Sequence, residues 1–345
     1  MQHDKTRLRV LYDPEPRGSA EIFSPDRAEQ FHRDHQVFEW LGEDRDDFYT
    51  RHLPHTDILI SQQPMGRARL DMAPALSAII NVETNFLPNI DYDECFRRGI
   101  HVLAPGAVFA GPVAEMALGM ALSLARNIHG EHSAFVRGQE KWLFEGNRQA
   151  ELLTGSTVGF VGFGDLGRAL CRLLAPFGPR IQVFDPWLPA GHLARSGVLP
   201  VDLRTVMSAN RFVFVMASVT TENIGLISSE ALAWMQPGAM LLLLSRAAIA
   251  DFDALTAAAA SGRIRVASDV FPVEPTPKDD PIRSTPNFLF SPHRAGALVQ
   301  ALREIGDRVL EDVALLGKGL APVSCRRADR ETVARLRSLP IRKPE

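Results

Sequence analysis

The stretch that decides the fold is VGFVGFGDLGRAL, residues 158–170. Its glycines, Gly162, Gly164 and Gly167, have the spacing G-x-G-x-x-G between an apolar strand-like run and an amphipathic helical run. In a dinucleotide-binding βαβ unit, the first glycine permits a tight turn and the second lets a pyrophosphate approach the backbone. The third lets the helix pack closely on the strand. Because strand and helix both flank the glycines, the stretch predicts a Rossmann domain.

The residues after the glycine turn predict which dinucleotide is bound. The helix begins at Asp165 and Leu166, whose backbone N–H groups would face the anion. A carboxylate is unexpected beside phosphates, so we expect the Asp165 side chain to point away. The next strand, RIQVFDP, carries Asp185, 21 residues after Gly164. An acidic residue there accepts hydrogen bonds from the adenosine ribose and repels a 2′-phosphate, which predicts NAD rather than NADP.

Composition excludes several classes of protein. The 345 residues suffice for about two domains, and 46% hydrophobic with 23% charged residues is ordinary for a globular chain. A net charge of −3 predicts no bulk attraction to nucleic acid. Three distant cysteines indicate reduced thiols in a cytoplasmic protein. The close histidine pairs lack a third ligand, which predicts no metal site. The basic last twenty residues predict a solvated tail.

One apolar run of the sequence could suggest a membrane-spanning helix. Residues 113–125 form a mostly apolar run that carries Glu115. This run is shorter than the roughly 20 residues that cross a bilayer. We therefore expect a buried helix, no membrane partner, and no signal peptide at the N-terminus.

Strand-like and helical segments alternate along the chain in two series, which predicts an α/β protein with two doubly wound parallel-sheet domains. The second series contains runs that are apolar throughout, as expected for strands covered on both faces. The expected strands are RLRVLYD, QVFEWL, DILIS, SAIINV and GIHVL, followed by TVGFVGFG, RIQVFD, RFVFVMA, AMLLLLS, RIRVASDV and NFLFS.

Three residues of catalytic type follow strands of the second series. Arg246 ends the strand LLLLSR, Glu274 follows RIRVASDV, and His293 follows the last strand, FLFS. In an open parallel sheet, ligands bind beyond the carboxyl ends of the strands. All three side chains are therefore expected at the edge that carries the glycine turn.

These residue types suit hydride transfer between nicotinamide and C2 of a 2-hydroxy or 2-oxo acid. The planar guanidinium of Arg246 can bind the carboxylate and the carbonyl together. The C2 oxygen needs a group that gives and takes a proton, which suits the imidazole of His293. Glu274 would hold the other ring nitrogen and stabilise the protonated ring.

With this set of residues, the chain resembles the NAD-dependent D-isomer-specific 2-hydroxyacid dehydrogenases. The resemblance covers residues 79–317, with matching stretches in the family's order. They are RRGIHV, VAEMALGMALSLAR, VGFVGFGDLGRAL, VFDP, VTTENIGLI, MQPGAMLLLLSRAAIADFDAL, SGRIRVASDVFPVEP and SPHRAG.

The resemblance implies roles for further residues. Asp269 would touch the nicotinamide carboxamide, and further residues would line the cofactor: Ala217, Ser218, Leu244 and Ser245. Thr84, Asn85 and Phe86 would face the substrate, here in VETNFLPNID, which lacks the family's glycines.

The resemblance also implies an architecture. A dinucleotide-binding domain, residues 105–295, would be inserted into a flavodoxin-like substrate domain made of residues 1–104 and 296–345. Members of the family are commonly homodimers, joined through the long helix after residue 112 and the arm that follows.

Two departures and two alternatives accompany the resemblance. The family's usual Arg-Gly is Arg246-Ala247, so the backbone after the arginine must avoid positive φ. Arg294 replaces a residue that is often apolar, as a surface ion pair or a contact to a second anionic group. Formate dehydrogenases share the fold but pair their histidine with glutamine, which Glu274 argues against. NAD-sensing corepressors keep all three catalytic-type residues, so a regulatory protein with little turnover stays open.

Overall fold

The computed structural model describes residues 7–83 and 85–335, which form two compact units. Within the described residues, the first unit comprises 7–83, 85–108 and 298–335, and the second comprises 109–297. The sequence predicts divisions at 104/105 and 295/296. The assignment of the first unit to the substrate stays a prediction.

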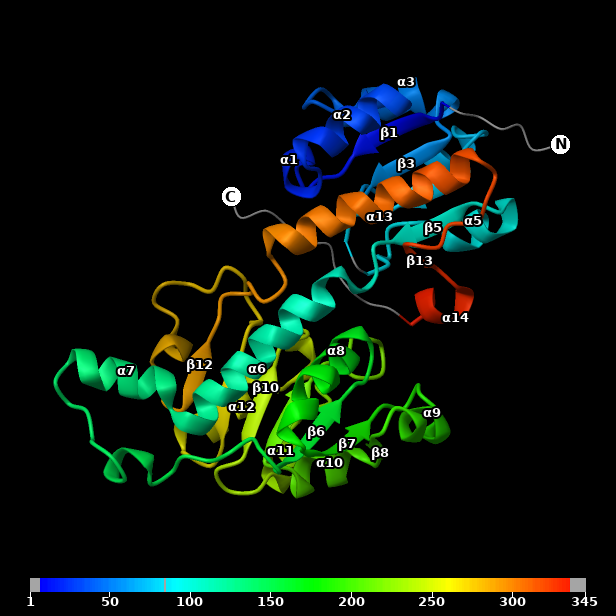
Figure 1. The fold of residues 1–345 in the computed structure, drawn as a ribbon. Coiled ribbons are helices and arrows are strands. Elements are labelled where there is room, and N and C mark those ends of the chain that lie inside the picture. The colour runs from blue at the N-terminus through cyan, green and yellow to red at the C-terminus, as the bar shows by residue number, and fades with distance from the viewer. Residues whose placement is uncertain (1–6, 84, 336–345) are drawn as a thin grey trace. The chain divides into compact units, whose positions relative to one another are not determined.

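The first unit is built on a six-stranded sheet, of which Figure 1 labels β1, β3, β5 and β13. The strand order is β13-β5-β4-β3-β1-β2. All pairings are parallel except that of β13 with β5. Without β13, the order 2-1-3-4-5 is that of flavodoxin-like folds. The strands are β1 (Arg9–Asp13), β2 (Gln36–Glu39), β3 (Ile58–Ser61), β4 (Ala78–Ile80), β5 (His101–Ala104) and β13 (Arg326–Arg327).

Three helices of the first unit begin at residues whose side chains cap them, and a small residue lets another pack closely. Ser24, Asp44 and Asp91 each accept a hydrogen bond from a backbone N–H in the first helical turn. Gly306 lets α13 approach α1 closely, since a Cβ there would lie 2.1 Å from the Ile22 carbonyl oxygen. The helices are α1 (Ser19–Ile22), α2 (Pro25–Asp34), α3 (Arg45–His52), η1 (Leu53–His55), α4 (Arg67–Asp71), α5 (Tyr92–Arg98), α13 (Val299–Gly317) and α14 (Arg330–Val333).

Residues 326–335 keep their charged side chains exposed, as expected for a solvated tail, but their backbone is held on the first unit. β13 pairs with β5, and α14 packs against α5. The guanidinium of Arg330 lies 5.4 Å from the ring centroid of Phe96. Backbone pairing and this cation–π contact hold the basic segment on the first unit. Residues 336–345 lie outside the described residues.

The second unit is built on a seven-stranded parallel sheet with the order β12-β11-β10-β9-β6-β7-β8. This is the Rossmann order, extended by one strand, and the fold class predicted from the sequence is confirmed. The strands are β6 (Thr157–Val161), β7 (Arg180–Phe184), β8 (Leu199–Pro200), β9 (Phe212–Val215), β10 (Met240–Leu243), β11 (Arg265–Ser268) and β12 (Phe288–Phe290).

Helices flank this sheet, and local signals set their ends. Asp251 caps α12 through the N–H of Ala254, and Gly262 follows it with φ +73°. The helices are α6 (Ala110–Arg126), α7 (Ile128–Val136), η3 (Glu145–Asn147), α8 (Asp165–Leu174), η4 (Ala175–Phe177), α9 (Ala190–Arg195), α10 (Leu203–Ala209), α11 (Ser229–Trp234), η5 (Ala247–Ile249), α12 (Phe252–Ala260) and η6 (Pro281–Ser284), while η2 (Ala107–Phe109) contains the boundary between the units.

The apolar helix α6 is longer than its apolar run predicted. With η2 it forms a 20-residue helical segment, Ala107–Arg126, with a mean hydropathy of 1.6, so by length and composition it qualifies as a candidate membrane span. The expectation that this segment is too short was therefore wrong. The helix instead packs against α8, β10 and β11. Ala114, Ala117 and Ala121 are fully buried there, as in the core helix of a globular domain.

Candidate active site

The glycine turn after β6 has the geometry that each glycine requires. Gly162 has φ +89°, and a Cβ on it would lie 2.5 Å from the Cα of Ala217. A Cβ on Gly167 would lie 2.9 Å from the Gly162 carbonyl oxygen. Both positions exclude any larger residue, since real Cβ atoms do not approach other atoms so closely. The turn therefore brings β6, α8 and the end of β9 into direct backbone contact.

Gly164, the N-cap of α8, faces open space instead. A Cβ built there meets no atom within 4 Å. The space lies at the amino end of a ten-residue helix, where backbone N–H groups lack intrahelical partners. The neighbouring carboxylate of Asp165 forms an ion pair with Arg168 at 2.6 Å, which neutralises its charge. The open space, the backbone N–H groups at the start of α8 and the neutralised carboxylate of Asp165 together fit a pyrophosphate.

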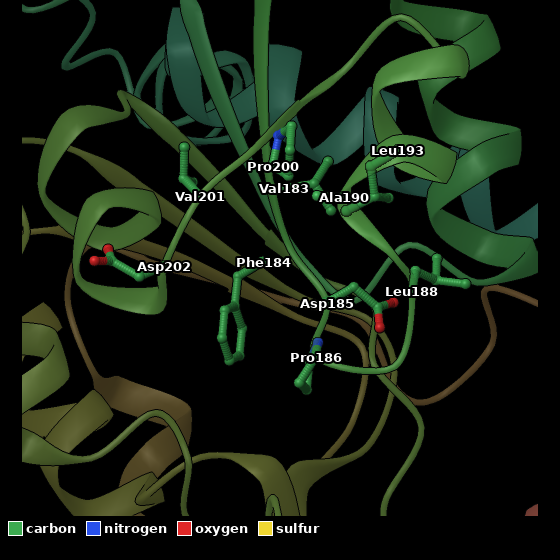
Figure 2. A pocket seen from close by; sticks show the side chains of 10 residues that line it. All are labelled: Val183, Phe184, Asp185, Pro186, Leu188, Ala190, Leu193, Pro200, Val201 and Asp202. Atoms are coloured by element: carbon green, nitrogen blue, oxygen red, sulfur yellow. The ribbon is translucent and has the colours of Figure 1, made fainter.

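Asp185 follows β7 and borders a hollow in the surface of the second unit. Its carboxylate accepts hydrogen bonds from the N–H groups of Phe163 (2.8 Å) and Trp187 (3.0 Å). The hollow has a volume of about 490 Å³ (Figure 2). Figure 2 shows its lining side chains: Val183, Phe184, Asp185, Pro186, Leu188, Ala190, Leu193, Pro200, Val201 and Asp202. A mostly apolar hollow beside a carboxylate fits an adenosine group.

The other residues expected to line the cofactor follow the central strands at the same edge. Ser218 follows β9, and its carbonyl oxygen accepts a hydrogen bond from the Asn223 side chain at 2.7 Å. Leu244 and Ser245 follow β10, and both are buried. Among the described residues, no partner reaches the buried Oγ of Ser245. A buried hydroxyl without a hydrogen-bond partner costs free energy in the folded protein. The Ser245 hydroxyl is therefore suited to bond a polar group of a ligand.

His293 and Glu274 form a direct pair. Nδ1 of His293 lies 2.5 Å from Oε2 of Glu274, and about a third of each side chain is exposed. Oε1 of Glu274 accepts a second hydrogen bond from the Phe271 N–H at 2.8 Å. With Nδ1 donating to a carboxylate, the neutral ring has its acceptor at Nε2. The structure thus brings these two residues together as expected from the sequence.

Arg246 helps to keep Glu274 of this pair ionised. Burial acts to raise the pKa of Glu274, but hydrogen bonds from His293 and Phe271, with the positive charges of His293 and Arg246, outweigh it. The pKa of Glu274 therefore lies below its ordinary value, and the group is a carboxylate at neutral pH. Nη1 of Arg246 donates to the Ser245 carbonyl at 2.7 Å. Ala247 begins η5 and is not among the residues with positive φ, which confirms the expectation from the missing glycine.

The turn that carries His293 has an unusual backbone. His293 has φ +47°, a left-handed conformation that non-glycine residues seldom adopt and that clusters at functional sites. Its N–H donates to the Ser291 carbonyl at 3.0 Å. The carboxylate of Asp269, which is 1% exposed, accepts hydrogen bonds from the N–H groups of Arg294 and Ala295, both at 3.0 Å. It also accepts one from the Ser291 hydroxyl.

The expected substrate residues lie in the first unit. Thr84 lies outside the described residues. Asn85 is partly exposed, and its carbonyl oxygen accepts a hydrogen bond from the Asn81 side chain at 3.0 Å. The Phe86 side chain is 2% exposed and belongs to the core of the first unit, so only its backbone is available to a ligand.

Sequence reasoning missed Ser291, which was treated only as a strand end, although serine before proline is a frequent side-chain-to-backbone turn residue. Gln62, just after β3, lies in the segment Ser61–Met65, which the sequence suggests for the substrate side. It is 5% exposed, and both of its amide atoms lack a partner among the described residues. Between residues 7 and 335, Thr84 excepted, no three potential ligands form a group that could hold a metal ion.

The glycine turn, the Rossmann strand order and the row of strand-end residues point to a dinucleotide-binding protein. Comparison with known proteins agrees. The family described as D-isomer specific 2-hydroxyacid dehydrogenase, NAD binding domain, matches residues 118–295, more than half of the chain.

Individual relatives carry related names. The hydroxypyruvate reductase of Thermotoga maritima is 32% identical over 66% of this chain and 73% of its own length. The D-3-phosphoglycerate dehydrogenase of Mycobacterium tuberculosis is 29% identical over 80% of this chain, which spans about half (52%) of that relative. A crystal structure of a phosphoglycerate oxidoreductase from Rhizobium etli is 47% identical. It covers 94% of this chain and all of its own, with a TM-score of 0.85.

The chain belongs to the D-isomer specific 2-hydroxyacid dehydrogenase family. Its second unit contains the family's NAD-binding domain.

Proposed function

We propose that the protein is an NAD-dependent dehydrogenase that interconverts a D-2-hydroxy acid and the corresponding 2-oxo acid. The observation that carries this proposal is the His293–Glu274 pair at 2.5 Å, on the sheet that also bears the glycine turn. When bound, the oxidised cofactor NAD⁺ would supply the hydride acceptor and the reduced cofactor NADH the hydride donor. The protein's own residues bind the acid, orient it and move the proton.

Arg246 binds and orients the acid. Its guanidinium offers five N–H donors in a rigid plane, which can hold a carboxylate and a carbonyl oxygen at once. The hydrogen bond to the Ser245 carbonyl positions this group at the end of β10. A cation beside the C2 oxygen also stabilises the negative charge that develops there during reduction.

His293 moves the proton. In oxidation, Nε2 takes the proton of the C2 hydroxyl. In reduction, Nε2 returns it to the C2 oxygen. Glu274 keeps Nδ1 as the donor, so Nε2 is available to the substrate, and its negative charge stabilises the ring in the protonated state.

Residues around the glycine turn bind NAD. The N–H groups at the start of α8 hold the pyrophosphate, and the Asp185 carboxylate holds the ribose hydroxyls and disfavours a 2′-phosphate. Further contacts come from Ala217, Ser218, Leu244, Ser245 and Asp269. In the first unit, Thr84, Asn85 and the backbone of Phe86 contribute to the substrate side.

The proposal includes a cytoplasmic homodimer with a small acid as substrate, and no nucleic-acid or membrane partner. α7 and the chain that follows it project from the body of the second unit (Figure 1). Exposed apolar surface of this kind is typical of protein interfaces. The exposed large apolar side chains of α7 and of the residues up to η3 are Ile128, Phe135, Val136, Trp142, Leu143 and Phe144. Sedimentation of wild type and of Trp142→Glu with Phe144→Glu tests the dimer, which the double variant should dissociate.

Turnover tests the activity. The purified chain is mixed with NADH and a panel of 2-oxo acids, namely glyoxylate, pyruvate, hydroxypyruvate, bulkier acids and dicarboxylic acids, and NADH absorbance is followed. At least one acid should be reduced, and His293→Ala should lower kcat by about 10²-fold or more. The matched control, His55→Ala, removes an exposed histidine of the first unit and should leave kcat unchanged. Binding of NADH without turnover of any acid would favour the regulatory alternative.

A further inference from the structure

The carboxylate of Asp269 is engaged by the protein itself, around the residue that carries the proposed chemistry. Oδ1 accepts hydrogen bonds from the Ser291 hydroxyl and the Arg294 N–H, and Oδ2 accepts one from the Ala295 N–H. These donors stand before and after His293 in the sequence. Three hydrogen bonds therefore enclose the turn on which the imidazole is mounted.

The strands explain why Asp269 reaches this turn. β11 and β12 are parallel neighbours, with Ser268 paired to Phe290. The next residues along the two strands, Asp269 and Ser291, therefore emerge side by side at the carboxyl end of the sheet. The N–H of Ser291 also donates to the Ser268 carbonyl at 2.9 Å. Asp269 is thus held by the sheet, while the turn that it binds has no regular secondary structure.

The turn needs such support because of its backbone. The left-handed conformation of His293 is disfavoured for a residue with a Cβ, and it persists only where the surroundings impose it. Two successive N–H groups directed at one carboxylate fix the peptide planes that follow His293. Fixing those planes fixes the Cα–Cβ direction of His293, and with it the 2.5 Å approach of Nδ1 to Glu274.

We infer that Asp269 is a positioning residue for the acid–base group, with Ser291 as its partner. It holds the left-handed turn that aims the imidazole of His293 at Glu274 and the substrate. This inference rests on the proposed function and is separate from the cofactor contact expected for Asp269. A carboxylate has about four acceptor sites, of which three are used here, so a contact to a ligand N–H is compatible with it.

Two substitutions test the inference in the full-length protein. Asp269→Asn keeps the shape of the side chain but replaces one acceptor by an N–H₂ donor, which would face backbone N–H groups. Ser291→Ala removes one hydrogen bond to Asp269 and leaves its carboxylate in place. Ser284→Ala removes a nearby exposed hydroxyl that bonds only locally, to the Pro281 carbonyl at 2.9 Å, and serves as the matched control.

Three measurements are made on each variant: kcat and KM for the best 2-oxo acid, NADH affinity by fluorescence titration, and the NMR signal of the His293 Nδ1 proton. A proton shared with a carboxylate at 2.5 Å should resonate far downfield, and His293→Ala assigns it. We expect kcat to fall about 10²-fold in Asp269→Asn and about tenfold in Ser291→Ala, because a small displacement of a catalytic group is costly. KM should change less, and the downfield signal should weaken in both variants. Ser284→Ala should match wild type, and NADH affinity in Ser291→Ala should stay within about threefold of wild type.

Other outcomes would overturn the inference. If both variants keep kcat and the downfield signal, the turn does not depend on Asp269. If Asp269→Asn loses NADH affinity as much as kcat while Ser291→Ala equals wild type, Asp269 serves the cofactor alone. If Asp269→Asn does not fold, Ser291→Ala decides. If wild type reduces no 2-oxo acid, the proposed function fails, but the NMR signal still reports whether Asp269 and Ser291 hold the His293–Glu274 pair.

Discussion

Replacing Glu274 by glutamine should shift the pH dependence of the reaction without changing its chemistry. Glutamine keeps the length of the side chain and an oxygen that can accept a hydrogen bond from His293, but the negative charge is lost. Oxidation needs the ring neutral, and the carboxylate favours the protonated ring. Without it, the acid limb for oxidation should move to lower pH. Reduction needs the protonated ring, so its alkaline limb should move the same way.

The geometry sets the size of this shift. Unit charges 2.5 Å apart interact by roughly 1.7 kcal/mol in water and roughly 7 kcal/mol at an effective dielectric constant of 20. With 35% of the His293 side chain and 33% of the Glu274 side chain exposed, solvent screening places the pair near the lower figure. The limbs should therefore move by about one pH unit, since about 1.4 kcal/mol corresponds to one unit. The pKa of Glu274 itself is lowered, so Glu274 titrates at a pH below the limbs that are compared.

The assay is kcat/KM in both directions between about pH 5 and 10, within the range where His-type groups titrate. A primary isotope effect with 4-deuterated NADH must first show that hydride transfer limits the rate. Glu230→Gln, at an exposed position in the first turn of α11, controls for the general effect of removing one negative charge. Should the Glu274→Gln profile overlay wild type while the isotope effect is expressed, Glu274 does not stabilise the protonated ring and the pairing has no catalytic role.

Four further predictions use other parts of the site. Arg246→Lys keeps the charge but loses the planar fork, so KM for the oxo acid should rise and kcat fall, and an equal loss of NAD affinity would contradict this role. Because of Asp185, kcat/KM should favour NADH over NADPH by at least about tenfold, and equal use would refute that assignment. Gly162→Ala should lower the free energy of unfolding in urea by roughly 1–3 kcal/mol, whereas Gly164→Ala should fold normally and bind NAD more weakly; equal unfolding midpoints would contradict the packing argument. Gln62→Met should raise the unfolding free energy by about 1 kcal/mol, since two buried polar atoms without partners disappear, and a loss of stability would mean that they are satisfied.

Much of the fold could be predicted from the sequence because its signals are local. The glycine spacing, the apolar strands of the second unit and caps such as Asp251 each act within a few residues. β8 and β13 were missed, because two-residue strands carry no periodicity to detect. β13 also forms through pairing with β5, more than two hundred residues away in the chain. Its arginines indicate solvent, and only the tertiary structure provides the backbone partner.

The candidate site could be predicted in its residue types but not in its supporting contacts. Arg246, Glu274 and His293 were identified because strand ends meet at one edge of a parallel sheet. The ion pair of Asp165 with Arg168 answers why an acidic residue is tolerated beside phosphates, but the sequence offered several arginines as partners. The left-handed backbone of His293 had no signal either, because neither proline before it nor arginine after it demands that conformation.

Strand register links the fold to the proposed chemistry. Leu243 of β10 pairs with Ser268 of β11, which pairs with Phe290 of β12, so Asp269 and Ser291 emerge in adjacent positions. A shift of one residue in β12 would turn the Ser291 side chain to the opposite face of the sheet and away from Asp269. β10 is fully buried, β11 is buried beyond Arg265, and Phe288 of β12 lies in the same apolar core with Phe290 packed against it, so their register is costly to change. The same buried packing that stabilises the second unit therefore holds the turn of His293, several residues beyond the last strand.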